Sequence, residues 1–331
     1  MNNHRSRSGM TIIELLVSLA IIGLLMALVV PAVQSAREAS RRVQCQSRLK
    51  EMALAVNAFQ ATRGVFPSAL TPWPGSNPVR SDWFYTPHVH LLPYLDQTAL
   101  FRRFDLKKTQ YFVVDPRTLD EFQNAKLEAF LCPSDAPNSG TNYRVCMGPG
   151  PYETDSKLNP GNGGGAFSMC QVFRPNDFRD GMSNTIALSE KLKSPGLSGG
   201  FTPEMFWYSG ASSFTSPYPA LDNMVTICGA LSGPPADFFP FAGRSWFITG
   251  YEYAWYNHAV TPNHKTPDCS VDPAPTGSST NGGVFKASSY HAGGVHCAFM
   301  DGHTKFVSNS IDRRVWRALS TRAGGESLTE P

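Results

Sequence analysis

The chain has 331 residues and a formal net charge of +3, a length that suits a membrane anchor followed by one sizeable head. Its 28 glycines and 26 prolines make up about a sixth of the sequence, a share below that of low-complexity disorder. No stripe of lysine and arginine points to nucleic acid, and the seven cysteines include no Cys-x-x-Cys pair, which argues against zinc ribbons and thioredoxin-like motifs.

An apolar segment of membrane length lies close to the N-terminus. Within residues 15–30 only Ser18 is polar, and a helix over residues 10–30 would span about 31 Å, the thickness of one hydrocarbon core. Glu14 places a carboxylate at the start of this segment, where an ionisable residue is costly and is therefore a candidate functional residue. Two interpretations of this apolar segment are a secretory signal that is cleaved near residues 35–36 and a plain anchor that is not cleaved.

A second helical pattern follows Pro31, which we expect to kink the helix rather than to end it. Over residues 32–61 apolar residues recur at steps of three and four, and charged residues mostly occupy the other side, as in an amphipathic helix. Gly64 and Pro67 then end the pattern. The sequence therefore predicts one helix of about 50 residues, with its first half in the membrane and its second half docked on a head.

Residues 62–331 are predicted to form the head. Alternating apolar residues on both sides of Asp301-Gly302 predict a hairpin of strands 295–300 and 303–307. Shorter patterns predict further elements, namely helices at 88–104, 117–130 and 311–320 and strands at 141–147 and 185–189. Residues 191–280 lack a clear period and are interpreted as variable long loops with short strands. We expect an α+β fold in which a mostly antiparallel sheet packs on the amphipathic half of the long helix.

The segment from Gly9 to Glu14, followed by the apolar run, resembles the prepilin cleavage and methylation motif of type IV pilins and type II secretion pseudopilins. The resemblance implies that residues 1–9 are a leader, which prepilin peptidase removes after Gly9 before it methylates Met10. Phenylalanine is usual at the position of Met10, and methionine is an accepted variant. The resemblance also implies that Glu14 pairs with the N-terminal ammonium of a neighbouring subunit. A plain boundary role for Glu14 is the alternative.

Most of the chain beyond this motif resembles the pilin-like DUF1559 family, which is abundant in planctomycetes. The matching segments are Pro31–Ala39, Arg41-Arg42, Gln44–Gln46, Leu91–Gln97, Phe130–Asp135, Asp180–Ile186 with Glu190, Val315–Leu319 and Ala323–Glu326. The C-terminal pattern H-x9-DG runs from His291 to Asp301-Gly302, and residues 191–280 do not match clearly. This resemblance implies a pilin-like architecture and leaves the biochemical role of the head open.

Two cysteines, Cys45 and Cys132, stand within the matched family segments. A disulfide between them would pin the head to the long helix, whereas the alternative is two separate buried thiols. The remaining five cysteines are not paired from sequence.

Polar clusters in the head are interpreted as structural. Strand alternation argues against one cluster of His291, His296 and His303, so a turn-fixing hydrogen bond is expected to hold His291 near Asp301, and no metal is expected there.

The oxygen atoms of Asp180, Ser183 and Asn184 suit either calcium or an Asx-turn, and the turn is the simpler explanation. Residues 196–200 fit G-x-S-x-G but lack the strand and helix of a hydrolase elbow, and we expect neither an enzyme nor a cofactor.

These observations predict a pilin-like or pseudopilin-like subunit. It would span the bacterial inner membrane once, hold its head outside the cytoplasm, and assemble through its N-terminal helix with copies of itself or with other pilin-like subunits. The alternative is a membrane-anchored extracytoplasmic protein that binds a glycan or another ligand through aromatic loops, such as those with Trp73 and Trp83.

Overall fold

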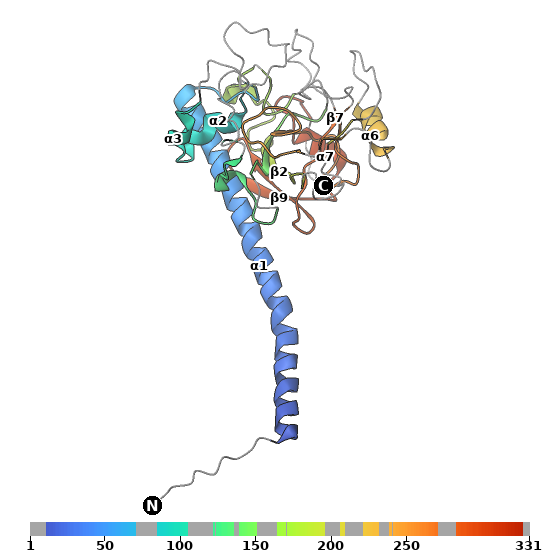
Figure 1. Cartoon of the computed structure of the whole chain (residues 1–331). Coiled ribbons are helices and arrows are strands. Elements are labelled where there is room, and N and C mark those ends of the chain that lie inside the picture. The colour runs from blue at the N-terminus through green and yellow to red at the C-terminus, as the bar shows by residue number, and fades with distance from the viewer. Residues whose placement is uncertain are drawn as a thin grey trace, which may run out of the picture. The chain divides into compact units, whose positions relative to one another are not determined.

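A computed structural model describes residues 11–70, 85–104, 122, 124–135, 139–150, 164–169, 171–195, 206–208, 221–231, 238–239, 241–270 and 283–326. The chain divides into two compact units, residues 1–43 and 44–331. Each unit is treated separately below, and Figure 1 labels the main elements of both. Gly9, Met10 and the leader lie outside the described residues, as do Trp73, Trp83 and Cys170.

Helix α1 (Ile12–Arg63) runs for 52 residues and continues through Pro31. It belongs to the first unit up to Val43 and to the second unit from Gln44 onward. In the first unit all residues from 11 to 37 are exposed, although most are apolar. Among the described residues, α1 is the one helix that is long and apolar enough to cross a membrane by length and composition. The predicted amphipathic half extends two residues beyond residue 61.

The second unit contains short helices, 3-10 turns (η) and two sheets. The helical elements are α2 (Pro87–Leu91), η1 (Leu92–Tyr94), α3 (Thr98–Phe101), η2 (Glu128–Phe130), η3 (Pro175–Asp177), α6 (Leu221–Gly229) and α7 (Arg313–Ala318). The strands are β1 (Tyr143–Cys146), β2 (Ile186–Glu190), β3 (Phe206–Tyr208), β4 (Phe238–Phe239), β5 (Trp255–Tyr256), β6 (Cys269–Ser270), β7 (Gly283–Val284), β8 (Gly294–Phe299) and β9 (Thr304–Ser308).

The larger sheet has the strand order β5-β1-β2-β8-β9, and the smaller one has the order β4-β3-β6-β7. Within the described residues, β1–β5 and β3–β6 pair in parallel and the other strand pairs are antiparallel. The fold is therefore α+β with a mostly antiparallel sheet, as the sequence predicted. The β8–β9 hairpin is present, and Gly302 adopts the positive φ of 92° that its turn requires.

The second half of α1 supplies one wall of the main core. Its buried residues Cys45, Leu49, Met52 and Val56 recur at steps of four, three and four, which places them on one face of the helix. They share a hydrophobic cluster with Tyr143, Val145 and Leu188 of the sheet, among others. A second cluster includes Cys146, Ile186, Cys297 and Trp316 and packs on the other face of the same sheet. Strands β1, β2, β5 and β8 are thus buried on both faces, whereas in the edge strand β9 only Val307 is buried.

Two expectations for the variable and helical regions need correction. Residues 191–280 were expected to hold only loops and short strands, but they contain the nine-residue helix α6, whose buried residues Met224 and Cys228 are one turn apart. The helix expected over residues 88–104, with an early turn at Pro93, is instead divided into α2, η1 and α3. Pro93 lies in η1, where it removes a backbone donor, and Asp96 adopts a positive φ of 57° in the break before α3.

Candidate functional site

The first candidate site is the start of α1. The backbone N–H and the hydroxyl of Thr11 both donate to Glu14 Oε2, at 2.8 and 2.9 Å, and the Glu14 N–H donates to the Thr11 hydroxyl at 3.3 Å. This reciprocal pair is a capping box, which satisfies helix-terminal donors that have no intrahelical partner. The spacing T-x-x-E before an apolar run is the sequence signal of such a box.

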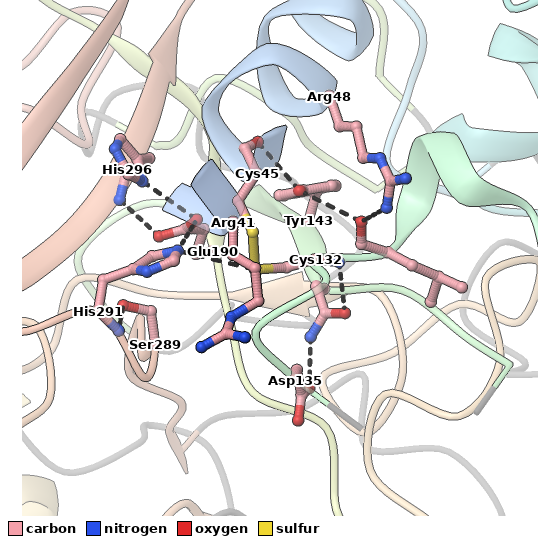
Figure 2. The surroundings of a disulfide bond; sticks show 12 residues. Arg41, Cys45, Arg48, Cys132, Asp135, Tyr143, Glu190, Ser289, His291 and His296 are labelled. Atoms are coloured by element: carbon pink, nitrogen blue, oxygen red, sulfur yellow. Dashed lines mark hydrogen bonds and ion pairs between the residues drawn. A yellow bond between two sulfur atoms is a disulfide. The ribbon is translucent and has the colours of Figure 1, made fainter. Parts of the chain in front are cut away.

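The second candidate site surrounds the disulfide between Cys45 of α1 and Cys132, whose sulfur atoms lie 2.07 Å apart (Figure 2). This is the bridge that the sequence offered as one alternative, the other being two separate buried thiols. The Tyr143 hydroxyl donates to the Cys45 carbonyl at 3.0 Å, and Arg48 Nη1 donates to the Leu131 carbonyl at 2.8 Å. The first contact ties α1 to β1, and the second ties it to the residue that precedes Cys132.

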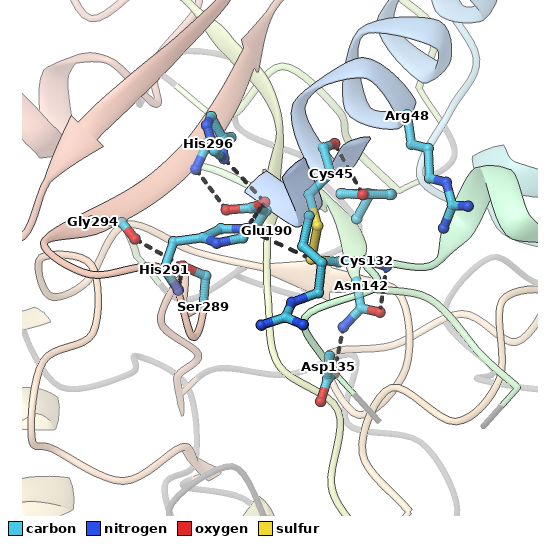
Figure 3. Close-up of polar contacts among 12 residues, drawn as sticks. Cys45, Arg48, Cys132, Asp135, Asn142, Glu190, Ser289, His291, Gly294 and His296 are labelled. Atoms are coloured by element: carbon cyan, nitrogen blue, oxygen red, sulfur yellow. Dashed lines mark hydrogen bonds and ion pairs between the residues drawn. A yellow bond between two sulfur atoms is a disulfide. The ribbon is translucent and has the colours of Figure 1, made fainter. Parts of the chain in front are cut away.

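The turn that carries Cys132 is held by its own polar contacts. The Cys132 N–H donates to Asn142 Oδ1 at 3.0 Å, and Asn142 Nδ2 donates to the Asp135 carboxylate (Figure 3). The Asp135 N–H closes the turn by donating to the Cys132 carbonyl at 3.0 Å. The Cys-Pro-Ser-Asp segment is therefore a preformed turn that presents the Cys132 sulfur to the helix.

A buried carboxylate with two imidazoles lies against this disulfide. Glu190 Oε1 is 3.2 Å from His291 Nε2 and 3.2 Å from His296 Nδ1, and Glu190 Oε2 accepts the His296 N–H at 2.7 Å. His291 Nε2 is also 3.7 Å from the Cys132 sulfur. Figures 2 and 3 show the His291 ring and the Glu190 carboxylate next to each other on one side of the bridge. All three side chains are at most 3% exposed.

The protonation of this cluster follows from its geometry. Burial would raise the pKa of Glu190, but the hydrogen bonds from His291 and His296 outweigh burial and hold the pKa below its ordinary value. Because an ionised carboxylate only accepts hydrogen bonds, His291 Nε2 and His296 Nδ1 both carry protons. A carboxylate is thus kept charged within the core by two imidazole donors.

Sheet register explains why these residues meet. Ser189 lies opposite Cys297 in the antiparallel β2–β8 pair, so the next position along places Glu190 opposite His296. His291 precedes β8 and is not bound by strand alternation, and its N–H donates to the Ser289 hydroxyl at 3.2 Å. The expectation that alternation would keep His291 and His296 apart was therefore wrong. Glu190 was noted only as part of a family segment.

The expected contact between His291 and Asp301 is replaced by others. Asp301 Oδ1 instead accepts hydrogen bonds from the backbone N–H and from Nδ1 of His303, at 3.1 and 2.6 Å. The six residues of β8 separate His291 from the turn, and a strand of that length extends about 20 Å. The two ends of the H-x9-DG pattern therefore serve different parts of the fold: the histidine meets the disulfide, and Asp301-Gly302 makes the hairpin turn.

Asp180 anchors the C-terminal segment. Its Oδ2 accepts from the Thr321 hydroxyl at 3.1 Å and from the Gly324 N–H at 2.7 Å, and its Oδ1 accepts from the Gly325 N–H at 3.0 Å. Asn184 Nδ2 donates to the Asp180 carbonyl at 2.9 Å, while Ser183 is exposed in the same turn. A backbone turn is present, since the Asn184 N–H donates to the Gly181 carbonyl at 3.0 Å. The oxygens of the Asp180 carboxylate, however, bind the C-terminal segment and not the local backbone of the expected Asx-turn.

The other described cysteines divide into one bridge and two thiols. Cys228 of α6 and Cys269 of β6 form a second disulfide that the sequence did not predict. Cys146 and Cys297 are buried free thiols, and burial raises the pKa of both. Such thiols are chemically inert because little thiolate is present.

Comparison with known proteins places the chain in a family. The family model described as "Protein of unknown function (DUF1559)" matches residues 34–314, and the model described as "Prokaryotic N-terminal methylation motif" matches residues 4–30. The type II secretion system core protein G of Pseudomonas aeruginosa is 32% identical over 95 residues, which cover 27% of this chain and 67% of that relative. No solved structure gives a significant match.

The motif and this relative support a pilin-like subunit, and together with the apolar α1 they suggest a membrane-anchored protein with its head outside. Because the family match extends over well more than half of the sequence, the chain belongs to the DUF1559 family and carries the prokaryotic N-terminal methylation motif.

Proposed function

We propose that this chain is a structural, non-catalytic subunit that prepilin peptidase cleaves after Gly9 and methylates at Met10. The mature chain then assembles through α1 into a type IV pilus or a type II secretion-like filament at the bacterial inner membrane. Its partners are copies of itself or other pilin-like subunits.

One observation carries this proposal. The first half of α1 exposes an apolar surface on all sides over residues 11–37, with the carboxylate of Glu14 at its start. A helix that is apolar all round is stable only in a membrane or among other apolar helices. A plain anchor explains the apolar surface, and the capping box explains a polar side chain at position 14, but neither needs its negative charge, which is costly in hydrocarbon and gains a partner when helices assemble. The relative named as a type II secretion core protein supports the same role.

The test is the N-terminus of the protein extracted from the membranes of its native host. Intact-mass and peptide analysis are expected to show a chain that begins at N-methylated Met10. A chain that begins near residue 37 would indicate a secreted head, and a chain that retains residues 1–9 would indicate a simple anchor. Either of these two results contradicts the proposal.

A cavity in the head supports a second candidate function, the binding of a glycan or another ligand. It measures about 310 Å³ and is lined by Asn124, Ser139, Phe241, Arg244, Ser245 and Tyr253. The Arg244 guanidinium lies over the Phe241 ring, 5.7 Å from its centre, so the cavity lining combines aromatic and polar side chains, as ligand pockets commonly do. Oligosaccharide binding that survives Glu14→Ala but is lost in Arg244→Ala would establish this function.

A further inference from the structure

The disulfide cluster contains the donor set of a zinc site. Ligand atoms of Cys45, Cys132, Glu190 and His291 all lie within 4.8 Å of one another, and all four residues are buried. Two thiolates, an imidazole and a carboxylate are ligands that Zn²⁺ takes in tetrahedral sites. The four residues come from α1, the Cys132 turn, β2 and the segment before β8, so the fold alone brings them together.

Two of the distances between these ligand atoms are close to those of a tetrahedral zinc site. With Zn–S near 2.3 Å and Zn–N and Zn–O near 2.1 Å, tetrahedral geometry separates sulfur from nitrogen by about 3.6 Å and nitrogen from oxygen by about 3.4 Å. The structure has 3.7 Å from the Cys132 sulfur to His291 Nε2 and 3.2 Å from His291 Nε2 to Glu190 Oε1. The two sulfur atoms must separate from the bonded distance to about 3.8 Å, and the other ligand atoms, which lie within 4.8 Å of one another, must draw together around the ion.

The surroundings of the cluster also suit a metal. His296 holds the Glu190 carboxylate through its backbone N–H and its Nδ1, as outer partners orient the ligands of metal sites. A small cavity of about 10 Å³ is lined by Cys132, Glu190 and Tyr290, among others. A cavity of this volume has room for roughly one water molecule. Tyr290 is 62% exposed, so this cavity connects the cluster with the surface.

We propose that reduction of the Cys45–Cys132 disulfide by a dithiol, which gives two electrons and two protons and itself becomes a disulfide, converts the cluster into a Zn²⁺ site in which Cys45, Cys132, Glu190 and His291 are the ligands. The proton on His291 Nε2 leaves that atom when the metal binds, and both thiols lose their protons. The reverse step consumes a disulfide oxidant: the two thiolates form the protein disulfide, the oxidant gains two electrons and two protons to become two thiols, and Zn²⁺ leaves.

In either state α1 stays linked to the Cys132 turn, by a covalent bond or by the metal. The site thus gives the head one crosslink under oxidising conditions and another under reducing conditions. This proposal is independent of cleavage and filament assembly, which use the other end of α1.

The experiment uses the full-length protein in detergent, reduced with a phosphine and freed of reductant without air. Co²⁺ is titrated as a spectroscopic probe, and Zn²⁺ is then added. The reduced protein is expected to bind one Co²⁺ per chain with the absorption of a tetrahedral thiolate complex, and Zn²⁺ is expected to displace it. Zn²⁺ should also protect Cys45 and Cys132 from alkylation in peptide-level mass spectrometry. The oxidised protein should show neither effect.

Matched variants separate this site from other thiols. Cys228→Ser/Cys269→Ser removes the second bridge and should leave Co²⁺ binding unchanged. His291→Gln keeps the disulfide, so the oxidised variant can fold. Loss of an outer partner such as His296 typically weakens metal binding about 10–100-fold, and loss of a ligand should weaken it at least as much. The reduced variant should therefore bind Co²⁺ at least about 10–100-fold more weakly. Equal affinity in His291→Gln overturns the proposal. So does alkylation of Cys45 and Cys132 at the same rate with and without Zn²⁺, including the case in which the reduced chain unfolds.

Discussion

Glu14 and Thr11 hold each other at the first turn of α1: Glu14 Oε2 accepts two hydrogen bonds from Thr11, and the Thr11 hydroxyl accepts the Glu14 N–H. The carboxylate therefore has a partner within its own chain before any neighbour arrives. Both bonds to the carboxylate end on Oε2, so capping is compatible with an ion pair through the other oxygen. Capping needs only a hydrogen-bond acceptor at position 14, whereas pairing with a neighbouring ammonium needs a negative charge. A substitution that removes the charge and keeps the acceptor can therefore distinguish the two roles.

Replacement of Glu14 by glutamine keeps the capping box, because glutamine also serves at this position, but it removes the charge. We expect both Glu14→Gln and Glu14→Ala to abolish assembly, measured as loss of the crosslinked ladder of subunits in cells that make the full-length protein. Ser18→Ala, which removes only a hydroxyl bond to the Glu14 carbonyl, is the matched control and should assemble. Normal assembly of Glu14→Gln would show that the cap, and not the charge, is what α1 needs.

The two disulfides differ in the length of chain that they close. Cys45 and Cys132 are 87 residues apart in sequence, and Cys228 and Cys269 are 41 apart. In the chain-entropy model their removal costs about 4–5 and about 4 kcal/mol, respectively. Cys45→Ala/Cys132→Ala should therefore lower the denaturation midpoint more than Cys228→Ala/Cys269→Ala, as measured by urea unfolding of the oxidised protein. The opposite order would contradict the loop-length argument.

Loss of the Asp180 carboxylate should release the C-terminal segment. It accepts two backbone N–H groups and one hydroxyl, so Asp180→Ala is expected to cost about 1–3 kcal/mol and to expose residues 323–326 to limited proteolysis. Asp301→Ala, which removes a carboxylate that also accepts a backbone N–H, is the control and should leave that segment protected. Because donors of the chain already use both oxygens of Asp180, added Ca²⁺ should not raise the melting temperature, and a rise would favour the calcium alternative.

Acid should destabilise the head through a buried histidine. Burial lowers the pKa of His258 to about 3, although its Nδ1–H donates to the Trp316 carbonyl at 2.6 Å, and its Nε2 is 3.0 Å from the Tyr256 hydroxyl. Between pH 6.5 and 3 the unfolded chain binds a proton at this position that the folded chain does not. The contribution of this group to the free energy of unfolding is therefore fully present above about pH 6.5. It decreases as the pH is lowered, by up to about 1.4 kcal/mol per pH unit.

The measurement is urea unfolding at pH 7, 6, 5 and 4. Burial lowers the pKa of His88 to about 4 as well, so this histidine contributes in the same direction and the slope reports more than one group. His258→Phe keeps an aromatic ring stacked on Trp316 and should reduce the slope by the equivalent of one proton. An unchanged slope in that variant would assign the acid sensitivity to other residues.

Local signals explain what could be predicted. The long α1 follows from its apolar run and its three- and four-residue steps, and the β8–β9 hairpin follows from alternation around Asp301-Gly302. Helix α6 was missed because only nine residues form it, too few for a clear period among the prolines and glycines around it. The Cys228–Cys269 bridge was missed for a related reason: cysteine spacing alone does not determine connectivity.

The sequence by itself determined the features that depend on neighbours along the chain: the membrane-length helix with Glu14 at its start, the amphipathic second half of α1, and the turn at Gly302. Tertiary structure alone decided that Glu190 meets His291 and Cys132, since these residues are 58 to 159 positions apart and are joined only when β2 pairs with β8 and α1 packs on the sheet. Periodicity reports which face of an element is buried, whereas strand register and packing decide which buried side chains touch.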